Sequence, residues 1–109
     1  MNITQLIIDA HKNGVDKGWH EKQRELPELL CLIHSEVSEV LEEHRKGYHP
    51  RQIYHAISGK PEGIPIELAD VVIRIADLCG LHNIDLEAAI REKMAYNKTR
   101  TYRHGNKIC

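Results

Sequence analysis

The chain has 109 residues, and fifteen basic against sixteen acidic side chains give it a formal net charge of -1. This length fits one compact domain, and 41% hydrophobic with 28% charged residues predicts a folded globular protein, not a disordered chain. The even charge balance argues against a module that binds a nucleic-acid polymer through many phosphate contacts.

The sequence predicts a protein of the reducing cytoplasm without membrane contact. No apolar run approaches the roughly 20 residues of a membrane span, and the first residues lack a signal-peptide pattern. The three cysteines, Cys31, Cys79 and Cys109, are odd in number and widely spaced. Such cysteines fit a reducing compartment better than a disulfide framework.

The first half of the chain predicts two helices. In the first, apolar residues recur at i, i+3, i+4 and i+7: Ile3, Leu6, Ile7 and Ala10. We expect Gly14 and Gly18 to end this helix, which leaves Trp19 at a bend. The second helix begins near Leu26 and is ended by Gly47 and Pro50.

The second half predicts a long connection, two further helices and a tail. Residues 48–63 form the connection, with one helical turn expected around 53–57. A third helix should start near Pro65 and end at Gly80 as its C-terminal cap. Asp85 is a suitable N-cap for a fourth helix from Leu86 to about Arg100. The tail from about residue 102 is expected to be irregular.

These elements predict a single all-α domain over residues 1–109. No internal repeat, low-complexity tract or linker marks a second domain. About four helices of this length are expected to pack in a form like a four-helix bundle.

Acidic residues form a stripe on each of two helices. On the second helix Glu36, Glu39 and Glu43 share one side, next to the apolar face. The third helix is apolar around nearly its whole circumference, which is typical of a buried helix. Its one polar stripe consists of Glu67, Asp70, Arg74 and Asp77.

If the two stripes face each other, Glu36, Glu39, Glu67 and Asp70 converge. At about 5 Å and an effective dielectric near 20, each pair of carboxylates repels by roughly 3 kcal/mol, so a cation is needed between them. All-oxygen ligands favour hard ions such as Mg²⁺ or Mn²⁺. Mg²⁺ also binds substrate phosphates, so the stripes indicate phosphoryl chemistry.

A structural interpretation of the same acidic residues stays open. An acidic stripe on a helix is often a solvated face, and Asp70 with Arg74 has the spacing of an ordinary i, i+4 ion pair. The pattern Glu-x-x-Glu is weak by itself, because it also occurs at Glu25 and Glu28.

Candidate phosphate ligands lie on the fourth helix. Lys93, Asn97 and Arg100 follow at i, i+4 and i+7 along the edge of its apolar stripe. Lys and Arg bind phosphate oxygens, and Asn can orient a phosphate or a sugar hydroxyl. The alternative is a basic edge that complements the helix dipole. Trp19, the only Trp, is either a core anchor or a surface on which a base stacks.

Taken in order, these segments resemble the MazG-like nucleotide pyrophosphohydrolases of the all-α NTP pyrophosphatase superfamily. Glu36-Val-Ser-Glu39 followed by Glu67-Leu-Ala-Asp70 resembles their Glu-x-x-Glu … Glu-x-x-Asp signature. The similarity extends to Gly18-Trp19 and to the segment from Lys93 to Arg100, and so covers most of the chain.

The resemblance implies hydrolysis of a nucleoside triphosphate between its α and β phosphates, which gives a monophosphate and pyrophosphate. Glu36, Glu39, Glu67 and Asp70 would hold Mg²⁺, and Trp19 would lie near the base. Lys93, Asn97 and Arg100 would contact the triphosphate. The resemblance also implies an obligate homo-oligomer, a dimer or a tetramer, with sites built partly at subunit contacts. Such an enzyme would serve the house-cleaning of the nucleotide pool or a narrower role.

The resemblance leaves the general base and the exact substrate open. Some members carry an acidic residue directly before the first Glu, where this chain has Ser35; Glu36 or Glu39 is then the expected base. Two alternatives remain: a non-catalytic helical oligomeric interaction module, and a related pyrophosphohydrolase acting on a modified or biosynthetic nucleotide.

Overall fold

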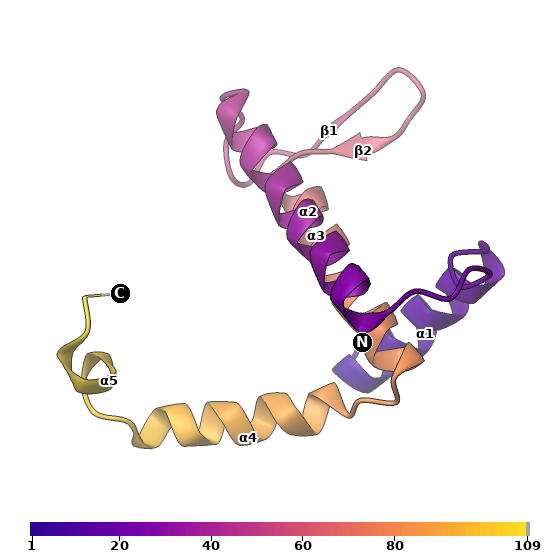
Figure 1. The fold of residues 1–109 in the computed structure, drawn as a ribbon. Coiled ribbons are helices and arrows are strands. Elements are labelled where there is room, and N and C mark those ends of the chain that lie inside the picture. The colour runs from indigo at the N-terminus through magenta and orange to yellow at the C-terminus, as the bar shows by residue number, and fades with distance from the viewer. Residues whose placement is uncertain (109) are drawn as a thin grey trace.

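The computed structural model describes residues 1–108 and is mostly helical (Figure 1). The first helix, α1 (Ile3–Asp16), begins where the Asn2 side chain accepts a hydrogen bond from the Gln5 backbone N–H. It continues through Gly14, so the expectation that Gly14 ends it is wrong; Gly18, with φ of 83°, lies just beyond its end. The second helix, α2 (Leu26–Arg45), ends before Gly47, as predicted.

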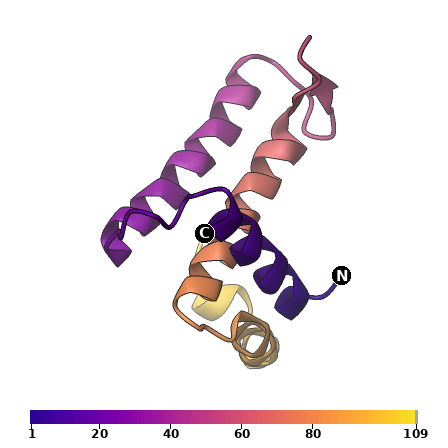
Figure 2. The same cartoon turned by 90° about the vertical axis from the view of Figure 1, so that its right-hand side faces the viewer.

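The connection after α2 contains a small hairpin where a helical turn was expected. β1 (Tyr54–His55) pairs antiparallel with β2 (Pro61–Glu62), and Tyr54 lies opposite Glu62. Gly59 in the turn has φ of 90°, a left-handed conformation that favours glycine. The hairpin stands at the end of the α2–α3 pair (Figure 2).

The third helix, α3 (Ile64–Leu81), has Pro65 in its first turn, where its missing N–H lacks a helical partner anyway. Gly80 is not its cap: the helix continues to Leu81, and Asn83, with φ of 55°, takes the left-handed position after it. The fourth helix, α4 (Leu86–Thr99), starts as predicted at Asp85, whose side chain accepts from the Ala88 N–H. In the tail, which was expected to be irregular, residues of α5 (Arg103–Asn106) form a single turn with positive φ throughout, which is not a regular α-helix.

Three of the helices pack together. α2 and α3 run antiparallel, and α1 crosses the carboxyl-terminal half of α3 (Figure 2). α4 contacts α1 near its start and then extends away from the other helices (Figure 1). The all-α class is confirmed. One chain does not form a complete four-helix bundle, because α4 does not pack along the other three helices.

A single chain leaves much apolar surface uncovered. Its accessible surface is 8579 Å², whereas a compact monomer of this mass exposes about 6,200 Å². The radius of gyration is 16.6 Å, against about 13 Å for a compact domain of this length. In the single chain, the helix whose apolar circumference predicts burial, α3, exposes about half of Leu68, Val72 and Ile73.

Among residues 1–108, no helix combines the length and apolar character that crossing a membrane requires.

Candidate functional site

The structure brings the acidic stripes of α2 and α3 together. Carboxylate oxygens of Glu36, Glu67 and Asp70 all lie within 4.8 Å of one another. The antiparallel packing of α2 on α3 produces this cluster, because residues near the middle of α2 meet the first two turns of α3. We refer to Glu36, Glu67 and Asp70 as the carboxylate cluster.

The pKa of Glu67 reflects the close approach of these carboxylates. Its pKa is raised above the ordinary value of 4.5, first by burial and then by the negative charge of neighbouring carboxylates. The contributing neighbours include Asp70, Glu39, Glu43 and Glu36. Glu39 is therefore close enough to act on Glu67 although it is not part of the carboxylate cluster. A cation bound here would relieve this repulsion.

The third member of the α2 stripe has a structural partner. Glu43 is buried, and its Oε2 accepts a hydrogen bond of 2.8 Å from the Tyr54 hydroxyl of the hairpin. Partial burial and this hydrogen bond raise the pKa of Tyr54, so the hydroxyl remains a donor. Glu43 therefore fixes the hairpin to α2.

Arg74 connects the carboxylate cluster to Trp19. Its Nε donates a hydrogen bond of 2.9 Å to Glu36 Oε1 on the neighbouring helix, so its ion pair is with Glu36 and not with Asp70, the partner that the alternative interpretation allowed. Its guanidinium carbon also lies 5.7 Å from the centroid of the Trp19 ring. The sequence placed Arg74 in the polar stripe but did not single it out as a site residue.

One pocket of about 520 Å³ is lined by Trp19 and Arg74 together with Glu36 and Asp70 of the carboxylate cluster. Its walls come from α1, the segment between α1 and α2, α2 itself and α3, and they include Trp19, Arg24, Glu36, Asp70 and Arg74. This size is within the usual range for a small-molecule site. Trp19 is 54% exposed, so it is not buried as a core anchor.

The predicted phosphate ligands on α4 lie elsewhere. None of Lys93, Asn97 and Arg100 lines the pocket, because α4 extends away from it (Figure 1). Instead, Lys93 Nζ and the Arg100 guanidinium lie 5.1 and 5.6 Å from the ring centroid of Tyr96. Within one chain these basic residues and the carboxylate cluster are separate.

Ser35, which precedes the first Glu of the motif, is also engaged locally. Its hydroxyl donates to the Leu32 carbonyl in the preceding turn, at 2.6 Å. The Glu36 carboxylate is held by Arg74, whereas Glu39 is exposed and forms no ion pair among residues 1–108. Of the two expected bases, Glu39 is therefore the one free to accept a proton.

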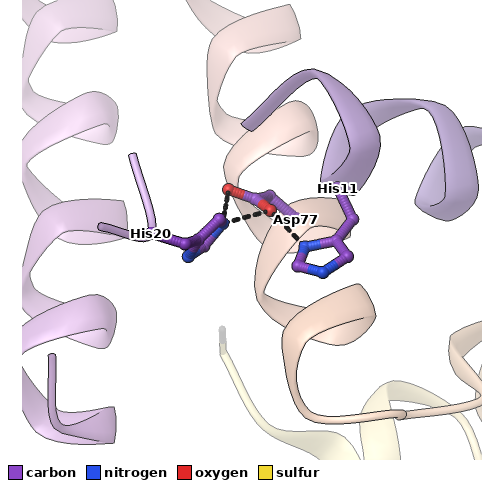
Figure 3. A group of neighbouring side chains, drawn as sticks. All are labelled: His11, His20 and Asp77. Atoms are coloured by element: carbon purple, nitrogen blue, oxygen red, sulfur yellow. Dashed lines mark hydrogen bonds and ion pairs between the residues drawn. The ribbon is translucent and has the colours of Figure 1, made fainter. Parts of the chain in front are cut away.

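Asp77, the last member of the α3 polar stripe, belongs to a second group that the sequence did not predict. Its carboxylate accepts hydrogen bonds from His11 of α1 and from His20 of the segment before α2 (Figure 3). These contacts join residues far apart in the chain, and no local spacing signals them.

Comparison of the chain with protein-family models, with curated proteins and with solved structures finds no match.

Proposed function

We propose that the protein is a Mg²⁺-dependent nucleoside triphosphate pyrophosphohydrolase that cleaves between the α and β phosphates. The observation that carries this proposal is the carboxylate cluster, two members of which, Glu36 and Asp70, line a pocket that also holds Trp19 and two arginines. Oxygen ligands, basic side chains and a partly exposed aromatic ring are the groups needed for a metal ion, phosphates and a base.

Glu36, Glu67 and Asp70 are the residues that would hold the ion, with Mn²⁺ as an alternative to Mg²⁺. Three oxygen donors without nitrogen or sulfur fit a hard cation. The raised pKa of Glu67 supports the same assignment, since it reflects burial first and then the negative charge of the neighbouring carboxylates. When bound, Mg²⁺ supplies positive charge for the phosphate oxygens and Lewis acidity for the attacking water.

The remaining groups have complementary roles in this proposal. Glu39 accepts the proton of the attacking water, because its carboxylate is exposed and unpaired within residues 1–108. Arg24 and Arg74 stabilise the negative charge that develops on the phosphates. Trp19 offers one face of its ring to a planar base, while the Arg74 guanidinium restrains it.

The predicted contribution of α4 requires a second copy of the chain. Lys93, Asn97 and Arg100 do not reach the pocket of their own chain, so in this proposal they complete the site of a neighbouring subunit. The uncovered surface supports such an oligomer. The chain exposes about 2,400 Å² more than a compact monomer of this mass, an excess in the size range of obligate homo-oligomer interfaces.

The test is incubation of the full chain with Mg²⁺ and a panel of canonical and modified ribo- and deoxyribonucleoside triphosphates. We expect monophosphate and pyrophosphate from at least one substrate. Glu39→Gln and Asp70→Asn should each lower turnover by about 100-fold or more, with helical circular dichroism unchanged. Glu42→Gln is the matched control, because Glu42 lies on α2 and pairs with Arg45 at the surface.

Other products would contradict the proposal. Orthophosphate without pyrophosphate would mean that a different bond is cut. Equal turnover in Asp70→Asn and Glu42→Gln would remove the carboxylate cluster from the mechanism.

A non-catalytic helical interaction module is the second candidate, and the exposed apolar side chains of α3 favour it. Trp19 fluorescence separates the two, because the protein contains a single Trp. Oligomerisation with no product and no nucleotide-dependent change in fluorescence would support the module.

A further inference from the structure

We propose that His11, His20 and Asp77 form a second metal site, for a divalent transition-metal ion of the Zn²⁺ or Co²⁺ class. The inference is independent of the proposed enzyme activity. Ligand atoms of these three residues lie within 4.8 Å of one another, and none of them belongs to the carboxylate cluster.

The three side chains converge on one point from three parts of the fold (Figure 3). His11 Nδ1 lies 2.9 Å from Asp77 Oδ1, and His20 Nε2 lies 2.8 Å from the same oxygen. Zn²⁺ at about 2.0–2.1 Å from each ligand atom needs those atoms about 3.3 Å apart in tetrahedral geometry. Small side-chain rotations open the present hydrogen-bonded arrangement to that separation.

Two glycines make room for this arrangement. A Cβ at Gly14 of α1 would lie 2.8 Å from Asp77 Oδ2, and a Cβ at Gly80 of α3 would overlap Cβ and Cγ of His11. The helices therefore approach each other closely just where His11 and Asp77 meet, and the lack of both side chains allows it. The three-residue group is consequently part of the α1–α3 packing, not a chance surface contact.

The carboxylate of Asp77 is enclosed by imidazole groups. Its side chain is only 21% exposed, and within residues 1–108 no Lys or Arg forms an ion pair with it. A largely buried carboxylate requires hydrogen bonds or positive charge around it, and its side-chain partners among residues 1–108 are the two imidazole rings. A metal ion uses both neutral rings and the carboxylate together, and it displaces any extra ring proton to solvent.

The donor set determines the class of ion. Two imidazole nitrogens and one carboxylate oxygen suit Zn²⁺, Fe²⁺ or Co²⁺, whereas Mg²⁺ and Ca²⁺ prefer oxygen alone. His20 and Asp77 line the pocket, so an ion held by them would be within reach of water or a small ligand in that pocket. Three protein ligands match the ligand count of zinc sites that keep one open position.

The test is titration of the metal-free full chain with Co²⁺, followed by visible absorption, and then displacement by Zn²⁺. Cys31 and Cys109 are replaced by serine so that thiolates do not compete, and Mg²⁺ is kept in excess to occupy the carboxylate cluster. We expect saturable binding of one equivalent of Co²⁺. His11→Ala and His20→Ala should each weaken binding by about tenfold or more.

His34→Ala and His49→Ala are the matched controls, because both rings are exposed and outside the three-residue group. Nuclear magnetic resonance of the parent protein gives a second readout: Zn²⁺ should shift the ring signals of His11 and His20 among the eight histidines. This readout needs no variant, so poor folding of His11→Ala or His20→Ala does not affect it.

Absence of saturable Co²⁺ binding, or equal affinity in His20→Ala and His34→Ala, would overturn the proposal. Because no nucleotide is present, the result does not depend on pyrophosphate release. A protein that binds Co²⁺ but hydrolyses nothing would retain this site and lose the enzyme proposal.

Discussion

Glu67 is the carboxylate of the cluster whose protonation the fold affects most clearly. Burial and the surrounding negative charge raise its pKa above 4.5. A raised carboxyl pKa means that the folded state binds the proton more tightly than the unfolded state does. The resulting contribution to stability is complete below the unfolded pKa, and it is lost as the pH rises through the folded pKa.

Without metal, we therefore expect the Glu67→Gln variant to gain stability relative to the parent as the pH rises above about 4.5. Thermal melts of both proteins in chelator across this range measure the difference, and the comparison cancels the titration of carboxylates elsewhere. Added Mg²⁺ should stabilise the parent more than Glu67→Gln. A difference in Tm that stays constant with pH would contradict the assignment of Glu67 to a crowded cluster.

Residue spacing predicted part of this site because the α2 and α3 stripes are each local to one helix. That Glu36, Glu67 and Asp70 face each other follows from the antiparallel packing of α2 on α3 (Figure 2), whereas the facing of the two stripes was only a condition in the interpretation of the sequence. The Arg74–Glu36 ion pair was not predicted, since an i, i+4 partner on the same helix is the nearer choice in the sequence. The group around Asp77 depends on contacts across three elements, and no periodicity encodes those.

At the scale of elements, local chemistry predicted helix starts better than helix ends. Asp85 and Pro65 act within one turn, so their roles follow from the sequence directly. Gly14 and Gly80 were both interpreted as helix ends, yet both lie inside helices. Tertiary packing explains why glycine stands at these two positions, since each glycine faces a side chain of the other helix at the α1–α3 contact. The hairpin was missed because strands of two residues are too short to show alternation.

Gly80→Ala tests this interpretation of the α1–α3 contact. In a free helix the change stabilises by about 1 kcal/mol, but here the new Cβ overlaps His11. Overpacking of this kind costs about 1–3 kcal/mol, and each kcal/mol lowers Tm by roughly 4–8 °C in a domain of this size. Thermal denaturation should show a net loss of stability.

The His11→Gly variant supplies the control for Gly80→Ala, because it removes the Cβ that the new methyl group meets. In that background Gly80→Ala should be neutral or stabilising, so the two changes should couple in a double-mutant cycle. Additive effects would mean that Gly80 and His11 are not in contact.

At the scale of the whole molecule, length predicted a single domain and helical periodicity predicted its all-α class, but neither gave the amount of surface that one chain leaves uncovered. The apolar circumference of α3 predicted burial, and the chain by itself leaves Leu68, Val72 and Ile73 about half exposed. A sequence pattern states that a face must be covered, but it does not state whether the same chain covers it. The separation of α4 from the pocket raises the same question for the phosphate ligands.

Mixing two inactive variants tests whether the basic residues of α4 complete the site of a second chain. One variant, Asp70→Asn, lacks a carboxylate of the cluster, and the other, Lys93→Ala with Arg100→Ala, lacks the basic residues of α4. If each active site takes its acidic residues from one chain and its basic residues from another, mixed oligomers contain some sites with both sets intact. Random exchange in a twofold dimer restores such sites to about a quarter of the total.

Unfolding and refolding the two variants together, with each refolded alone as the control, provides the measurement. Pyrophosphate release by the mixture should then exceed the mean of the separate variants by a wide margin, because each alone lacks one half of every site. If the mixture only matches that mean, Lys93 and Arg100 act within their own chain or not at all. Since α4 extends away from the pocket of its own chain, the first outcome is the one that the fold predicts.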